Sequence, residues 1–229
     1  MALQLSAEDR DEMAVPSYLH GNPAMRWMAW RRVEAVAQRL ALACDGTVPA
    51  LRGGTVSGPA GEAHARRTVL DFGCGTGVLL GEAHARAGRV IGVDLVLDAA
   101  RMLVAADRLA RVELLTPEQA CAQVAPGSVD VVIAAEVLEH VEPLAPTLAF
   151  FRTCLRPGGK LLVSLPTESR LYRLGRKLAG FSGHYHHANA ASVDRELVAA
   201  GFRRTRLQTV PLPGPLAIYW VLDYVNDAS

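Results

Sequence analysis

The sequence is poor in cysteine and has no closely spaced cysteine pair. Its four cysteines are far apart, at Cys44, Cys74, Cys121 and Cys154. No C-x-x-C pair occurs, which argues against the common zinc modules and against a disulfide framework. A chain of 229 residues, half of them hydrophobic, can bury a sizeable core without either. We therefore expect one ordinary globular domain in a reducing, cytoplasmic compartment.

The chain also lacks a charge excess and a long apolar run. Lys and Arg number 24 against 23 Asp and Glu, so the net charge of +1 gives no overall field to attract nucleic acid. The first residues, MALQLSAEDRDEM, are acidic where a secretion signal would be basic and then apolar. The longest uncharged stretch, Leu207–Leu222, contains three prolines and is too short for a bilayer. We expect a soluble protein without a transmembrane segment.

Helical periodicity appears near the amino end. Residues 24–43 read AMRWMAWRRVEAVAQRLALA, in which apolar residues recur at helical spacing without glycine or proline. This pattern predicts an amphipathic helix, and we assign residues 1–45 to an N-terminal helical segment. Residues 46–67 are dominated by glycine, proline and small residues, and are interpreted as a flexible loop. Residues 68–229 then form the main domain.

Short apolar strands alternate with helical segments in that domain. Strands are predicted at 68–72, 89–94, 112–115, 129–134 and 160–165, and helices at 78–86, 98–109, 118–124 and 144–155. Such alternation is typical of βαβ units that build a parallel sheet with helices on both faces. Right-handed crossovers would bring the carboxyl ends of the strands to one edge of the sheet.

A glycine-rich loop separates the first strand from the first helix of the domain. Residues 69–77 read VLDFGCGTG, and Gly73, Gly75 and Gly77 would let a ligand approach the bare backbone. The G-x-G-x-G spacing differs from the G-x-G-x-x-G of dinucleotide enzymes, whose helix N-terminus binds a pyrophosphate. Asp71, two residues before the first glycine, would repel a pyrophosphate and attract an ammonium group.

A second acid extends this pattern. Asp94 ends the second strand, at the position that receives ribose hydroxyls in this architecture. An amine at Asp71 and a ribose at Asp94 together describe S-adenosylmethionine, a cationic amino acid joined to a nucleoside. The competing interpretation is a glycine turn with two solvated or capping aspartates. That interpretation explains the glycines when they are taken alone. It explains less well the combination of the glycines, the two acids and five βα units in register.

With these residues in place, the chain resembles the class I S-adenosylmethionine-dependent methyltransferases, within the group that includes the ubiquinone- and menaquinone-pathway enzymes. The matching stretches are VLDFGCGTG at 69–77, GVDL at 92–95, SVDVVIAAEVLEHV at 128–141 and LRPGGKLLVSLP at 155–166. The resemblance implies an α/β, Rossmann-like seven-stranded sheet, mostly parallel with an antiparallel last strand and with helices on both faces. Strands six and seven would be 203–210 and 216–221.

The resemblance also implies a set of cofactor contacts. S-adenosylmethionine, with S-adenosylhomocysteine as product, would meet Asp71, Gly73, Cys74, Gly75, Gly77, Asp94, Leu95, Glu118, Gln119 and Ala135. In this set Asp71 would contact the amine, Asp94 the ribose and Leu95 the adenine. Glu118, with Gln119 beside it, would receive the adenine amine. Here the sequence departs from the family, which has an aspartate in a Gly-Asp-Ala setting at that place.

Two histidines are candidates for a general base that accepts the proton of the methyl acceptor. His140 follows Glu136 by four residues on an expected helix, so the two side chains would share a face. Ordinary family scaffold is the alternative role for His140. His186 lies in the GHYHH run at 183–187, after strand five. Because no complementary cysteine or carboxylate cluster accompanies these histidines, we predict no metal site.

Two amphipathic segments bear on the methyl acceptor. Residues 170–178 repeat Arg and Lys between leucines, a pattern that suits an anionic substrate, a peripheral membrane contact or a solvated helix face. The N-terminal helix carries Trp27 and Trp30, and family members often use such a helix as a lid over the acceptor site. Core packing of these aromatic side chains is an equal alternative.

The sequence therefore predicts a methyltransferase that acts on a small, partly apolar molecule, most readily on oxygen. One alternative is a non-catalytic S-adenosylmethionine-binding scaffold or sensor. Another is a nucleic-acid methyltransferase, but AEVL at 135–138 stands where base-methylating enzymes carry Asn or Asp-Pro-Pro-Tyr. We expect a small-molecule acceptor, no nucleic-acid partner, and a monomer or homodimer.

Overall fold

One seven-stranded sheet organises the part of the chain that the structure describes. The computed structural model describes residues 22–46, 62–167 and 189–227. The strands are β1 Thr68–Phe72, β2 Arg89–Val93, β3 Val112–Leu115, β4 Val129–Ala135, β5 Leu155–Pro166, β6 Phe202–Pro211 and β7 Ala217–Asn226. Their order is β3-β2-β1-β4-β5-β7-β6, and β7 runs antiparallel to both of its neighbours. The predicted sheet with an antiparallel last strand is confirmed.

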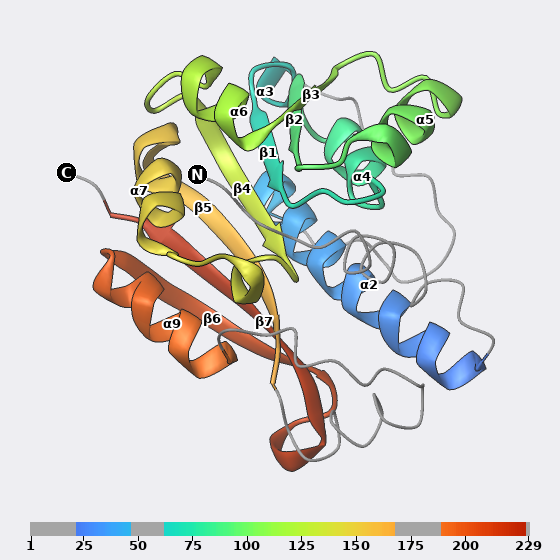
Figure 1. Ribbon diagram of the computed structural model, residues 1–229, viewed down its shortest axis with the longest axis vertical. Helices are drawn as coiled ribbons and strands as arrows, with labels where there is room; N and C mark the ends of the chain where they lie inside the picture. The colour runs from blue at the N-terminus through green and yellow to red at the C-terminus, as the bar shows by residue number, and fades with distance from the viewer. Residues whose placement is uncertain (1–21, 47–61, 168–188, 228–229) are drawn as a thin grey trace.

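Helices cover both faces of this sheet. They are α2 Pro23–Asp45, α3 Glu62–Ala65, α4 Leu80–His84, α5 Asp98–Ala106, α6 Pro117–Gln123, α7 Ala145–Cys154 and α9 Ala190–Ala199, with 3₁₀ turns η1 Leu138–His140 and η2 Gly214–Leu216. Figure 1 shows α6, α7 and α9 on one side of the sheet and the long α2 across the other. Asn22 caps α2 by accepting a hydrogen bond from the Ala24 N–H, and Gly46 ends it in the left-handed conformation.

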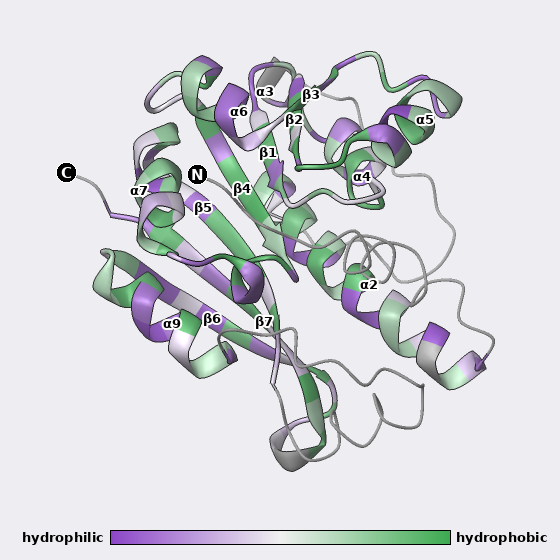
Figure 2. Ribbon diagram, in the orientation of Figure 1, coloured by the Kyte–Doolittle hydropathy of each residue, from purple (hydrophilic) through white to green (hydrophobic). Residues whose placement is uncertain are grey.

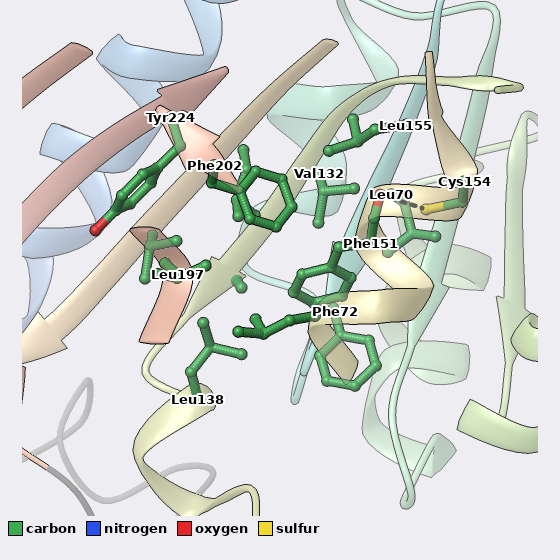
Figure 3. Packing of buried hydrophobic residues seen from close by; sticks show 14 of the residues in the cluster. Leu70, Phe72, Val132, Leu138, Phe151, Cys154, Leu155, Leu197, Phe202 and Tyr224 are labelled. Atoms are coloured by element: carbon green, nitrogen blue, oxygen red, sulfur yellow. Dashed lines mark hydrogen bonds between the residues drawn. The ribbon is translucent and has the colours of Figure 1, made fainter. Parts of the chain in front are cut away.

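The core consists of two layers because neighbouring strand residues point to opposite faces. Val132 of β4 packs with α7 and α9, whereas Val131 next to it packs with α2 and α4. Figure 3 shows the first layer, where the Phe72 and Phe151 rings meet edge to face with centroids 5.0 Å apart. In Figure 2 hydrophobic residues are frequent along the central strands of the sheet.

Three segments differ most from the sequence-based expectation, and the other boundaries agree within three residues. Strand β5 begins at Leu155 instead of residue 160, because Leu155 pairs with Val129 before a register shift and Lys160 pairs with Val131 after it. Strand β7 ends at Asn226 instead of residue 221, and it is antiparallel to β5 and β6 over most of its length. Within the loop expected over 46–67, residues 62–65 form the helical turn α3, and residues 47–61 lie outside the described part.

Helix α2 is held on the sheet by a buried ion pair. Both nitrogens of the Arg39 guanidinium fork, Nε and Nη2, donate to the two carboxylate oxygens of Asp223 on β7, and both residues are buried. This helix also contributes Val36 and Leu40 to the core layer that contains Val131. Among the described helices, none has the length and the apolar composition required to span a bilayer.

Candidate functional site

A cavity of about 420 Å³ lies where the carboxyl ends of β1, β2 and β4 meet. Its lining comes mainly from the ends of these three strands, from the turns that follow them and from α2, which contributes Arg32, Val33 and Val36. Because pockets of roughly 300–1,000 Å³ hold small ligands, the cavity is large enough for a nucleotide-sized molecule. It occupies the edge of the sheet at which the sequence analysis places the ligand.

The glycine loop forms one wall of this cavity through two glycines with different surroundings. Gly73 has a φ of +75° and Gly75 a φ of +53°, both in the left-handed region. A Cβ at position 73 would lie 2.5 Å from the Val137 side chain, whereas a Cβ at position 75 would meet no atom of the described residues within 4 Å. Gly73 therefore allows the loop to pack against the turn after β4, and Gly75 leaves space open on the cavity side.

Asp94 ties the glycine loop to the end of β2. Its Oδ2 accepts a hydrogen bond of 2.7 Å from the Gly75 N–H, and its Oδ1 accepts one of 3.2 Å from the Val96 N–H. A carboxylate has about four acceptor positions, so capacity remains for the hydroxyls of a ribose. The ribose contact itself stays a prediction, and the structure adds a role in holding the loop that the sequence did not indicate.

Asp71 is a buried acid on the cavity wall. It is only 2% exposed and lies in β1 beneath the glycine loop. Burial and, to a smaller extent, the Asp94 carboxylate raise the pKa of Asp71 from 3.8 to about 7. A cation bound in the cavity would stabilise the ionised carboxylate and would therefore lower the pKa of Asp71 again. The site is therefore electrostatically suited to a positively charged ligand.

We expect the affinity for S-adenosylmethionine to rise with pH through about 7. Only ionised Asp71 attracts the cation, so below pH 7 each unit should weaken binding by up to about tenfold, and above about pH 8 the affinity should level off. Calorimetric titration across this range measures the effect. In Asp71→Asn the affinity should be lower and nearly independent of pH. A flat profile for the native chain would contradict the prediction.

The turn after β4 differs from the helix that the sequence suggested. Glu136 has a φ of +54°, and only Leu138–His140 form a short 3₁₀ turn, so the prediction that Glu136 and His140 share one helical face is wrong. The Glu136 N–H still donates to the Ser164 carbonyl on β5, so the strand ladder extends to Glu136 before the chain turns. A non-glycine residue in this conformation is strained, and such residues often occur at functional sites.

The Glu136 side chain connects three elements at the cavity. Its Oε1 accepts a hydrogen bond of 2.8 Å from Ser164 Oγ on β5, and its Oε2 accepts one of 3.2 Å from Arg32 Nη1 on α2. The Arg32 guanidinium also lies 5.1 Å from the centre of the Tyr219 ring on β7. Sequence reasoning missed Arg32 as a site residue, because nothing near position 32 signals a partner 104 residues away.

His140 lines the same cavity. Its side chain is 11% exposed, and its Nε2 lies 4.0 Å from Oε1 of the buried Glu139. The two groups can form an ion pair only when the imidazole carries a proton. His186, the second candidate base, and the basic segment 170–178 lie outside the described residues.

Of the other predicted cofactor contacts, some line the cavity and some do not. Cys74, Leu95 and Ala135 line the cavity with the residues already described, but Gly77 is not in its lining. Glu118 and Gln119 are exposed at the start of α6, where Gln119 closes a capping box with Thr116. Their neighbour Pro117 lines the cavity. Adenine recognition by Glu118 or Gln119 remains a prediction, and Gln119 has a structural partner that competes for its side chain.

Comparison with known proteins gives a consistent result. A family model described as a methyltransferase domain matches residues 38–207. The chain is 33% identical over 173 residues to a "probable S-adenosylmethionine-dependent methyltransferase" of Mycolicibacterium smegmatis, a match covering 76% of this chain and 58% of that protein. It is 36% identical over 180 residues to a ubiquinone biosynthesis O-methyltransferase of Paraburkholderia xenovorans, covering 71% and 76%. The chain spans about half the length of the first curated relatives it matches.

Solved structures share the fold. A S-adenosylmethionine-dependent methyltransferase from Aquifex aeolicus superposes with a TM-score of 0.64 at 17% identity, covering 97% of this chain and 99% of that one. The N-methyltransferase NodS from Bradyrhizobium japonicum, in complex with S-adenosylhomocysteine, also has a TM-score of 0.64 at 17% identity, covering 96% and 98%. At this identity the likeness concerns the arrangement of helices and strands.

Proposed function

The chain belongs to the class I S-adenosylmethionine-dependent methyltransferases, and from this premise we propose that it transfers a methyl group from S-adenosylmethionine to an oxygen atom of a small, partly apolar molecule. The observation that carries the proposal is one cavity that combines the glycine loop, Asp71 and Asp94 with a histidine. The ubiquinone biosynthesis O-methyltransferases among the relatives support oxygen as the acceptor atom.

The residues of the cavity fit a cationic amino acid joined to a nucleoside. S-adenosylmethionine supplies an activated methyl group on a positively charged sulfur. Asp71 and Asp94 place negative charge on the cavity wall, and the open space beside Gly75 allows close approach to the main chain. Loss of the sulfonium charge on methyl transfer would weaken the attraction to these acids and favour release of the product.

The chain's own contribution to the reaction is mainly alignment. Orientation of two reactants can contribute roughly 7–11 kcal/mol, and a base is needed only for an acceptor that arrives protonated. A phenol has a pKa of about 10 and a histidine about 6.5, so a hydroxyl proton would move to His140 as the new bond forms. The buried Glu139 carboxylate, 4.0 Å from Nε2, would stabilise the resulting imidazolium.

His140→Ala should lower kcat for a hydroxyl acceptor by roughly a hundredfold, because a positioned general base typically contributes at least that factor. The affinity for S-adenosylmethionine should change little. Steady-state kinetics combined with calorimetry separates the two effects. His84→Ala is a matched control, since His84 lies on α4 outside the cavity lining. Unchanged kcat in His140→Ala would remove this residue from the reaction.

The proposed activity is tested with S-adenosylmethionine labelled in its methyl group. Phenols and catechols with apolar substituents, primary amines and oligonucleotides are offered in parallel, and mass spectrometry identifies the methylated atom. We expect transfer to the hydroxyl acceptors. Binding of S-adenosylmethionine without transfer to any acceptor class would favour a scaffold or sensor, and transfer to amines alone would overturn oxygen as the target.

A further inference from the structure

A second, smaller cavity lies at the opposite edge of the sheet. It has a volume of about 150 Å³ and is lined by Ala43, Arg66, Arg67, Asp130, Val131, Arg156 and Lys160. These residues come from the amino ends of β1 and β4, the start of β5 and the end of α2. The larger cavity at the carboxyl edge shares none of these described lining residues, so the two cavities are separate.

Positive charge is concentrated around this second cavity. Four of its lining residues are Arg or Lys and one is an aspartate, which leaves an excess of three positive charges. The whole chain has a net charge of only +1. The excess is therefore a local feature, and an anion would meet a favourable field there.

Two of the four cations are engaged by the protein. Arg156 Nε donates a hydrogen bond of 2.7 Å to Oδ1 of Asp130, whose Oδ2 accepts one of 2.9 Å from the Thr68 N–H. Arg67 Nη1 donates to the Arg86 carbonyl at 3.2 Å and lies 4.0 Å from a carboxylate oxygen of Asp45. These contacts fix the two guanidinium groups at the cavity, where Asp130 is the one acid among the described lining residues.

Arg66 and Lys160 provide the charge that remains. Across residues 22–46, 62–167 and 189–227, neither side chain takes part in an ion pair or a hydrogen bond, although the Asp227 carboxylate, which pairs with Arg203, is near enough to Lys160 to interact with it electrostatically. Lys160 is only partly exposed, so its ammonium group is partly removed from water. A cation in this position gains from an anionic partner, which replaces lost hydration with a charge-assisted hydrogen bond.

We propose that this cavity binds the phosphoryl group of a small molecule. The volume of about 150 Å³ is below the roughly 300 Å³ at which drug-sized ligands begin, so only a compact group fits. Phosphate carries up to two negative charges and oxygen acceptors on several sides, which match two guanidinium forks and an ammonium group. A carboxylate would leave more of the local charge uncompensated. This inference is independent of the methyl-transfer reaction.

The test is titration of the full chain with inorganic phosphate at constant ionic strength, followed by calorimetry and by phosphorus NMR line width. We expect saturable binding at one site, with chloride unable to compete at the same ionic strength. Lys160→Gln and Arg66→Gln should each weaken phosphate binding roughly tenfold, the value of one charge-assisted hydrogen bond. Arg101→Gln is the matched control, because Arg101 is an exposed residue of α5 paired with Asp98, outside the cavity lining.

The outcomes separate a built site from general charge attraction. Absence of saturable binding overturns the proposal, and so does an equal loss of affinity in Arg101→Gln and Lys160→Gln. Glycerol phosphate and phosphatidylglycerol vesicles distinguish the sources of the phosphoryl group. Binding of glycerol phosphate that depends on Lys160 supports the proposal, whereas binding of vesicles alone overturns it. Thermal unfolding without phosphate identifies any variant whose fold has been lost, and Arg66→Gln, at an exposed position, keeps the test decisive in that event.

Discussion

Gly75→Val is expected to abolish saturable binding of S-adenosylmethionine while the protein remains folded. A Cβ at position 75 meets no atom within 4 Å in the described part of the chain and would extend into open space beside the cavity. The protein therefore has room for the added Cβ, but a side chain at this position would occupy the space of a ligand that lies against the loop. The φ of +53° adds a backbone cost of roughly 1–3 kcal/mol for a non-glycine residue, which a stable domain can absorb.

Two other glycines provide the controls for this experiment. Gly127 has a φ of +65°, space for a Cβ with no described atom within 4 Å, and no place in the cavity lining, so Gly127→Val carries similar strain and should bind normally. Gly73→Val should instead lose stability, because its Cβ would lie 2.5 Å from Val137. Calorimetry and thermal unfolding of the three variants distinguish blocked binding from strain. Retained affinity in Gly75→Val would refute the assignment of the loop.

The contrast between these glycines also shows how far the sequence could lead. Gly73 and Gly75 are close in sequence, and the regular βα alternation places Asp94 at the same edge of the sheet. The sequence pattern therefore predicts a cofactor site at that edge. The difference between the two glycines depends on Val137, which is distant in sequence from the loop and comes close only in the folded sheet. Spacing alone therefore predicts the loop but not the consequence of each substitution.

The acceptor side of the cavity is less accessible to sequence reasoning. The spacing of four residues between Glu136 and His140 predicts a helix, yet the main chain at Glu136 continues the β4–β5 ladder and then turns with a positive φ. Residue preferences do not predict a glutamate with a positive φ, since glycine and asparagine are the usual residues in that conformation. Its contact with Arg32 depends in turn on the position of α2, which packing on the sheet determines.

Arg39→Met is expected to destabilise the protein by about 3–5 kcal/mol, because it leaves the buried Asp223 carboxylate without a counter-charge. Asp223→Leu should have a similar cost for the complementary reason. The free energy of unfolding, obtained from denaturant titration, measures both. Arg203→Met is a useful control, since Arg203 pairs with Asp227 at an exposed position where solvent screens the charges, and it should have little effect.

The double variant Arg39→Met/Asp223→Leu decides whether the buried pair acts through charge or through shape. If the cost arises from an uncompensated charge, removing both partners should restore most of the stability lost in either single variant. If instead the double variant loses as much as the sum, the guanidinium fork is needed to seat α2 on β7. That second result would affect the cavity as well, because Arg32, Val33 and Val36 reach it from the same helix. The affinity for S-adenosylmethionine should then fall with stability, whereas under the charge explanation the double variant should bind like the native chain.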